Sequence, residues 1–71
     1  MNITTEKWVQ SFQFLDELRE SGETNMFGAR PYLLTEFDEL TESEARTIVK
    51  AWMKTFDPNK TPKERVENMN D

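Results

Sequence analysis

The chain has 71 residues, of which 14 are acidic and nine are basic, and its formal net charge is −5. A chain of this length forms a single domain with a small hydrophobic core, and its two Trp, five Phe and one Tyr supply much of the apolar bulk. It contains no cysteine and no histidine, which excludes disulfides, thiolate or imidazole zinc sites, and Ser-His or Cys-His nucleophile pairs.

The charge is divided unequally along the chain. Residues 1–45 carry ten acidic and three basic side chains, a sum of −7, whereas residues 46–71 carry four acidic and six basic ones, a sum of +2. The overall acidity argues against general binding to duplex DNA, because phosphate neutralisation supplies most non-specific affinity. No signal peptide or long apolar run is recognisable, so we expect a cytoplasmic protein that does not span a membrane.

The first predicted helix covers residues 4–21. Thr4 is placed to cap its N-terminus, with Ile3 and Trp8 in the positions of a hydrophobic staple. Gly22 follows as a helix stop. One face is apolar and is predicted to be buried through Trp8, Phe12, Leu15 and Leu18, with Val9 and Phe14 at its margins. The other face is charged and is predicted to meet water through Asp16, Glu17, Arg19 and Glu20.

The second predicted helix, residues 26–37, is the least regular. Gly28 and Pro31 both disfavour an uninterrupted helix. We therefore expect one turn near Met26, a bend, and a short helix from about Pro31 to Phe37. Two residues of this segment are predicted to join the core, Leu33 and Phe37.

Residues 41–56 carry the clearest helix signal. Thr41 and Glu44 match a capping box, in which each residue bonds the backbone N–H of the other. Helical spacing brings one apolar stripe together, formed by Ala45, Ile48, Val49, Trp52, Met53 and Phe56. On the opposite face three cations recur every fourth residue, and we call this set the basic row: Arg46, Lys50 and Lys54.

The last predicted helix covers residues 61–69 and follows a turn at residues 57–60. Thr61 and Glu64 repeat the capping-box pattern. Only Val66 and Met69 are apolar, so we expect this helix to pack weakly. The fold class is thus predicted to be all-α: a small three-helix domain with a marginal fourth C-terminal helix, in one domain whose core covers about residues 4–57 and whose residues 58–71 are weakly packed. The predicted core consists of Trp8, Phe12, Leu15, Leu18, Leu33, Phe37, Ile48, Val49, Trp52 and Phe56.

Several short sequence motifs in the chain form a pattern: LRESG at 18–22, TNMFGA at 24–29, PYL at 31–33, Phe37, Glu44-Ala45, Trp52-Met53 and Phe56. This pattern resembles a family of small proteins of unknown function encoded by tailed bacteriophages, and it covers about residues 14–56. The resemblance implies phage origin, location in the host cytoplasm, and a larger phage or host protein as partner. It implies no particular activity.

Two surfaces are candidates for binding a partner. Around residues 25–32, Phe27, Arg30 and Tyr32 could contact a partner, or the segment could be an inter-helix corner whose apolar residues fill the core. The basic row, extended by Lys60, Lys63 and Arg65, could meet phosphates or an acidic protein surface, or it could be a solvated helix face. Five carboxylates form an acidic cluster: Glu36, Asp38, Glu39, Glu42 and Glu44. Their spacing is not that of a calcium loop, so we interpret the cluster as a solvated bend.

These features predict a small non-enzymatic protein-interaction module that binds and modulates a larger phage or host protein. No metal and no cofactor are expected, and the chain is expected to be a monomer or a weak homo-oligomer, self-associating through Val9, Phe14 or Tyr32. The alternative is a nucleic-acid-binding accessory module that uses one basic face, formed by Arg46, Lys50, Lys54, Lys60 and Lys63.

Overall fold

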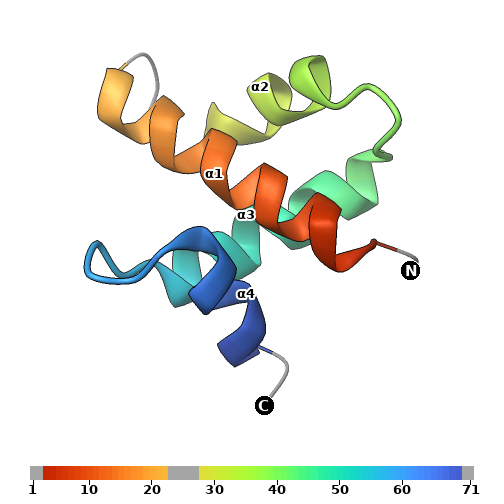
Figure 1. Cartoon of the computed structure of the whole chain (residues 1–71). Coiled ribbons are helices and arrows are strands. Elements are labelled where there is room, and N and C mark those ends of the chain that lie inside the picture. Colours follow the sequence, from red (N-terminus) through yellow and green to blue (C-terminus); the bar gives the residue numbers. More distant parts are fainter. Residues whose placement is uncertain (1–2, 23–27, 70–71) are drawn as a thin grey trace.

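A computed structural model describes residues 3–22 and 28–69 of the chain. These residues form four helices and no strand: α1 (Thr5–Ser21), α2 (Ala29–Glu36), α3 (Glu42–Thr55) and α4 (Pro62–Met69). In Figure 1, α1 crosses in front of α3, with α2 on one side of α1 and α4 on the other. The prediction of an all-α fold is confirmed. No helix in the described ranges combines the length and the apolar character that a bilayer crossing requires.

The predicted ends of α1 are confirmed. The Thr4 hydroxyl accepts a hydrogen bond from the Lys7 backbone N–H at 3.1 Å, which satisfies one of the free donors of the first turn. Gly22 follows the helix in the left-handed region with φ of 71°, and its N–H donates to the Arg19 carbonyl. Glycine adopts this conformation without a steric cost, so the sequence stops α1 where the backbone turns away.

Helix α2 differs from its predicted course. It begins at Ala29 and continues through Pro31 to Glu36, whereas the sequence suggested a bend before Pro31. Proline is tolerated here because it is the third helical residue, and the first N–H groups of a helix have no partner within the helix. The expected turn near Met26 lies outside the described residues.

Helix α3 has the predicted capping box and the predicted apolar stripe. The Glu44 N–H donates to the Thr41 hydroxyl at 3.1 Å, and the Thr41 N–H donates to the Glu44 carboxylate at 2.9 Å. The stripe faces α1 and α2, and its buried members are Ala45, Ile48, Val49 and Trp52. The cap and the stripe together fix both the start and the rotation of this helix.

The core lies where the four helices meet, and most of its predicted members are confirmed. The buried apolar residues are Phe12, Leu15, Leu18, Ala29, Leu33, Leu40, Ala45, Ile48, Val49, Trp52 and Val66. Trp8, Phe37 and Phe56 are only half-buried and pack against this cluster. Each makes an edge-to-face ring contact, with centroids 5.9 Å apart for Trp8 and Phe12 and 5.7 Å apart for Trp52 and Phe56. Phe37 pairs in the same way with Phe14, so aromatic side chains at the margin extend the core outward.

Helix α4 is not the marginal element that the sequence predicted. Val66 is fully buried and the side chain of Arg65 is only 2% exposed, and the helix packs against α1. The prediction failed because it counted only apolar residues, whereas Arg65 supplies much of the buried contact. A long charged side chain can cover apolar surface with its methylene groups while its head is paired.

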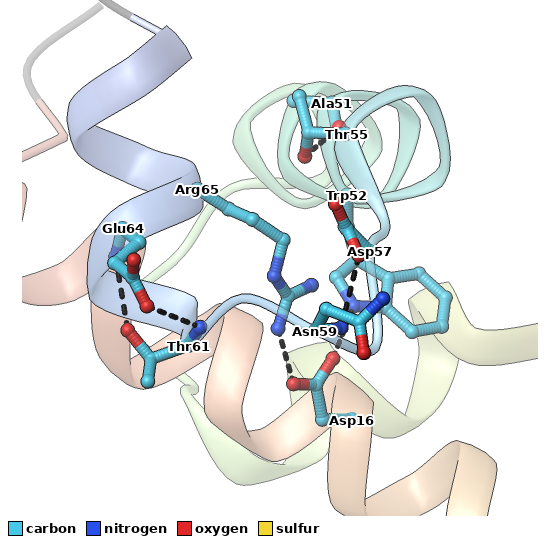
Figure 2. Close-up of polar contacts among 9 residues, drawn as sticks. All are labelled: Asp16, Ala51, Trp52, Thr55, Asp57, Asn59, Thr61, Glu64 and Arg65. Carbon is cyan, nitrogen blue, oxygen red and sulfur yellow. Dashed lines mark hydrogen bonds and ion pairs between the residues drawn. The ribbon is translucent and has the colours of Figure 1, made fainter.

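The capping box of α4 gives a prediction about pH. The Thr61 N–H donates to the Glu64 carboxylate at 3.0 Å, and the Glu64 N–H donates to the Thr61 hydroxyl at 3.2 Å (Figure 2). The Thr61 N–H, followed by the Thr61 side chain, lowers the pKa of Glu64 below its ordinary value of 4.5. A lowered pKa in the folded state means that the ionised carboxylate stabilises α4 above pH 4.5, and that this contribution is lost as the pH falls through the folded pKa.

We therefore expect the NMR shift of the Thr61 amide proton to titrate with a midpoint below 4.5. In Glu64→Gln this titration should disappear, because an amide can keep the capping bond but does not ionise. A midpoint at or above 4.5, or a titration that persists in Glu64→Gln, would contradict this account of the cap.

Candidate functional site

The basic row lies on the outer face of α3. Arg46, Lys50 and Lys54 are all exposed, and they are opposite the apolar stripe, as predicted. At 1.5 Å of rise per residue, the row extends about 12 Å along the helix axis. Within the described residues none of the three makes an ion pair or a hydrogen bond through its side chain. Three uncompensated cations therefore face solvent from one helix.

The scaffold beneath the row is well fixed. Trp52 is 1% exposed, and it lies on α3 midway in sequence between Lys50 and Lys54. The capping box at Thr41 holds the other end of the helix. A row displayed on a helix that is anchored at both ends keeps its spacing, which lowers the entropy lost when a partner is bound.

The second candidate surface lies on α2. Arg30 is half-buried, and Tyr32 is 41% exposed, which makes it the most exposed large apolar side chain in the described part of the chain. Phe27 lies outside the described residues. Arg30 and Tyr32 lie on α2, whereas the basic row lies on α3. Val9 and Phe14, which were considered for self-association, are half-buried against the core.

The proposed extension of the basic row is corrected in part. Lys60, in the turn before α4, and Lys63, on α4, are exposed as predicted. Arg65 is not part of any basic surface, because its side chain is buried and forms an ion pair with Asp16. The positive charge of Arg65 is therefore paired inside the fold and does not contribute to the basic surface.

Asp16 is the centre of a polar network that sequence reasoning missed. It was predicted to face water, but its side chain is only 27% exposed. One carboxylate oxygen accepts a hydrogen bond from the Trp52 indole N–H at 2.8 Å, and the other accepts from the Arg65 guanidinium (Figure 2). The guanidinium also lies 5.4 Å from the ring centroid of Phe56 and 5.8 Å from that of Phe12. One carboxylate therefore joins α1, α3 and α4.

Two signals in the sequence pointed to this network. A buried indole N–H usually finds an acceptor, and Trp52 was predicted to be buried. Asp16 follows Phe12 by four residues, which places it about 40° from Phe12 on the helix wheel and thus at the edge of the apolar face. Neither signal identifies Arg65, which is 49 positions away from Asp16.

The acidic cluster is used for local structure. Glu44 caps α3, and Glu39 forms an ion pair with Lys7 of α1. The hydrogen bond from the Lys7 ammonium, followed by a backbone N–H, lowers the pKa of the Glu39 carboxyl. The described residues contain no group of three or more carboxylates placed to hold a metal ion. The cluster thus caps the start of α3 and ties the turn between α2 and α3 to α1.

The comparisons add no relative from which a function could be transferred. No protein-family model, no curated protein and no solved structure matches this chain. The function proposed for it must therefore be argued from the surfaces described above.

Proposed function

We propose that the chain is a non-enzymatic interaction module whose basic row binds an acidic surface of a larger protein. The observation that carries the proposal is the row itself: Arg46, Lys50 and Lys54 are exposed, evenly spaced and unpaired within the described residues. The absence of cysteine and histidine from the sequence supports a role without nucleophilic chemistry.

The charge distribution supports a protein partner with a local acidic patch. The chain as a whole carries −5, so a uniformly anionic surface would be repelled at long range. At physiological ionic strength charges are screened over about 8 Å, so a patch that reaches the row is attracted mainly by the row. Such complementarity fixes the orientation of a complex and speeds its formation.

The surface on α2 is the proposed second contact. Tyr32 offers an exposed aromatic ring with a hydroxyl, and Arg30 offers a guanidinium, which are residue types that often anchor interfaces. The resemblance of residues 14–56 to small tailed-phage proteins makes a phage or host protein the proposed partner. A lysate of phage-infected cells is therefore the source in which to look for it.

The test is affinity capture followed by quantitative binding to the captured protein. We expect the wild-type chain to retain one stoichiometric protein partner, and Lys50→Glu/Lys54→Glu to bind it at least about ten-fold more weakly. The matched control is Lys60→Glu/Lys63→Glu, which changes the net charge by the same amount on exposed residues outside α3. It should bind within about two-fold of wild type. Equal losses in both variants, or no stoichiometric protein, would refute the proposal.

The nucleic-acid alternative is decided by the same variants. Single-stranded and branched DNA would be titrated at several salt concentrations, since phosphate binding weakens steeply with salt. If DNA binding depends steeply on salt and Lys50→Glu/Lys54→Glu abolishes that binding, the partner is a nucleic acid and not a protein. No binding at low salt would remove this alternative.

A further inference from the structure

The outward face of α1 carries a second regular row of polar side chains. Its members recur every three or four residues and are all exposed, and we call this set the α1 outer row: Glu6, Gln10, Gln13, Glu17 and Glu20. At 1.5 Å of rise per residue, it extends about 21 Å along the helix axis. Every member has a side-chain oxygen that accepts hydrogen bonds, and three members are carboxylates, so the row is negatively charged.

The carboxylates of the α1 outer row have no cationic partner within the described residues. Glu6 accepts one hydrogen bond from Gln10 of the same row at 3.3 Å, and no member of the row forms an ion pair in residues 3–22 and 28–69. These side chains are therefore available to cations from outside the molecule.

The α1 outer row and the basic row face away from each other. On α1 the outer row lies opposite the buried residues Phe12, Leu15 and Leu18. On α3 the basic row lies opposite the apolar stripe, which faces α1 and α2. Because α1 lies in front of α3 in Figure 1, the two rows are on opposite sides of this helix pair. They cannot meet within one molecule, but they can meet between two.

We propose that the basic row of one copy of this chain binds the α1 outer row of a second copy. Three cations spread over about 12 Å then meet a longer row of acceptors that includes three carboxylates. The interface joins two different surfaces, so each end of a pair keeps one surface free and the association continues head to tail. It covers the cations that the proposed partner would use and competes with that partner, but it requires no larger protein.

The charge of the whole chain makes this association weak. Each copy carries −5, so the charges outside the interface repel one another. At physiological ionic strength this repulsion is screened beyond about 8 Å, whereas oppositely charged groups across the interface are closer than that. Exposed ion pairs each contribute little, so we expect a dissociation constant on the order of millimolar.

The test is to follow the chain by NMR as its concentration rises from about 0.1 to 2 mM, a range that includes this dissociation constant. Translational diffusion should slow as the concentration rises, and the backbone amides of Glu17, Glu20, Lys50 and Lys54 should shift together. Raising the salt to about 1 M, where charges are screened over about 3 Å, should restore the diffusion of the monomer. Monomeric diffusion at every concentration, or an association that salt leaves unchanged, would overturn the proposal.

Charge-reversed variants identify the two surfaces. Lys50→Glu/Lys54→Glu and Glu17→Lys/Glu20→Lys should each stay monomeric, because in each variant the two rows carry net charges of the same sign. When the two variants are mixed in equal amounts they should associate again, since each presents the row that the other lacks. A mixture that stays monomeric would contradict the pairing of these two surfaces.

A matched control separates the interface from the effect of net charge. Glu36→Lys/Glu67→Lys changes the net charge as much as Glu17→Lys/Glu20→Lys does, but on exposed residues of α2 and α4. It should associate at least as strongly as wild type, and an equal loss in both variants would refute the proposal. At concentrations far below millimolar, Glu17→Lys/Glu20→Lys should still bind the larger partner, so failure of this inference and failure of the proposed function give different results.

Discussion

Replacing Asp16 with alanine is expected to cost about 3 kcal/mol of folding free energy, because it leaves the buried Arg65 cation unpaired and the Trp52 indole N–H without an acceptor. We take the low end of the usual range, since Asp16 is 27% exposed and water can reach part of the site. A chain of this length has a total stability of roughly 4–10 kcal/mol, so the loss is a large share of it. Urea denaturation followed by circular dichroism would measure the change.

A control and a double variant identify the cause of this loss. Glu17→Ala removes an exposed carboxylate from the next position of α1 and should change stability by less than about 0.5 kcal/mol. Adding Arg65→Met to Asp16→Ala should restore part of the loss, because an apolar side chain leaves no buried charge to compensate. If Asp16→Ala and Glu17→Ala were equally mild, the ion pair would not matter to the fold.

Trp52→Ala is expected to be at least as damaging, with a loss of roughly 3–5 kcal/mol. The side chain is 1% exposed, donates its indole N–H to Asp16 of α1, and makes an edge-to-face contact with Phe56 at 5.7 Å. Removing it leaves a cavity that the neighbouring helices cannot fill without shifting. Calorimetry should show a greatly lowered melting temperature or no transition at all.

Two variants with smaller expected losses of stability serve as comparisons for Trp52→Ala. Trp52→Phe keeps most of the ring volume but loses the hydrogen bond to Asp16, so it should cost less than Trp52→Ala. Tyr32→Ala removes an aromatic ring that is 41% exposed and should change stability by about 0.5 kcal/mol or less. A melting temperature of Trp52→Ala close to that of wild type would show that the indole is not enclosed.

Local sequence signals predicted the helices well where capping and apolar periodicity agreed. Helix α3 is the clearest case, because Thr41 and Glu44 set its start and the stripe through Trp52 set its rotation. Helix α2 was predicted less well, because the effect of Pro31 depends on its position within the helix. The start of α2 two residues before Pro31 cannot be read from the proline alone.

The sequence could not predict contacts that depend on the three-dimensional arrangement. Asp16 and Arg65 are 49 positions apart, and their pairing requires α4 to pack against α1. For the same reason, the basic row was predicted correctly as an exposed face, whereas its extension to Arg65 was wrong. Helical periodicity predicts which face of a helix a residue occupies, but the pairing of charges from different helices depends on the tertiary fold.

The position of Asp16 has a consequence for how the molecule opens. Its carboxylate accepts hydrogen bonds from two other helices at once, so releasing the C-terminal helix would leave this part-buried carboxylate beside the indole without its cationic partner. Piecemeal fraying of that helix is thereby penalised, although it has only eight residues. The last segment of the chain is thermodynamically coupled to the first, and the molecule is expected to lose its structure as a single cooperative unit.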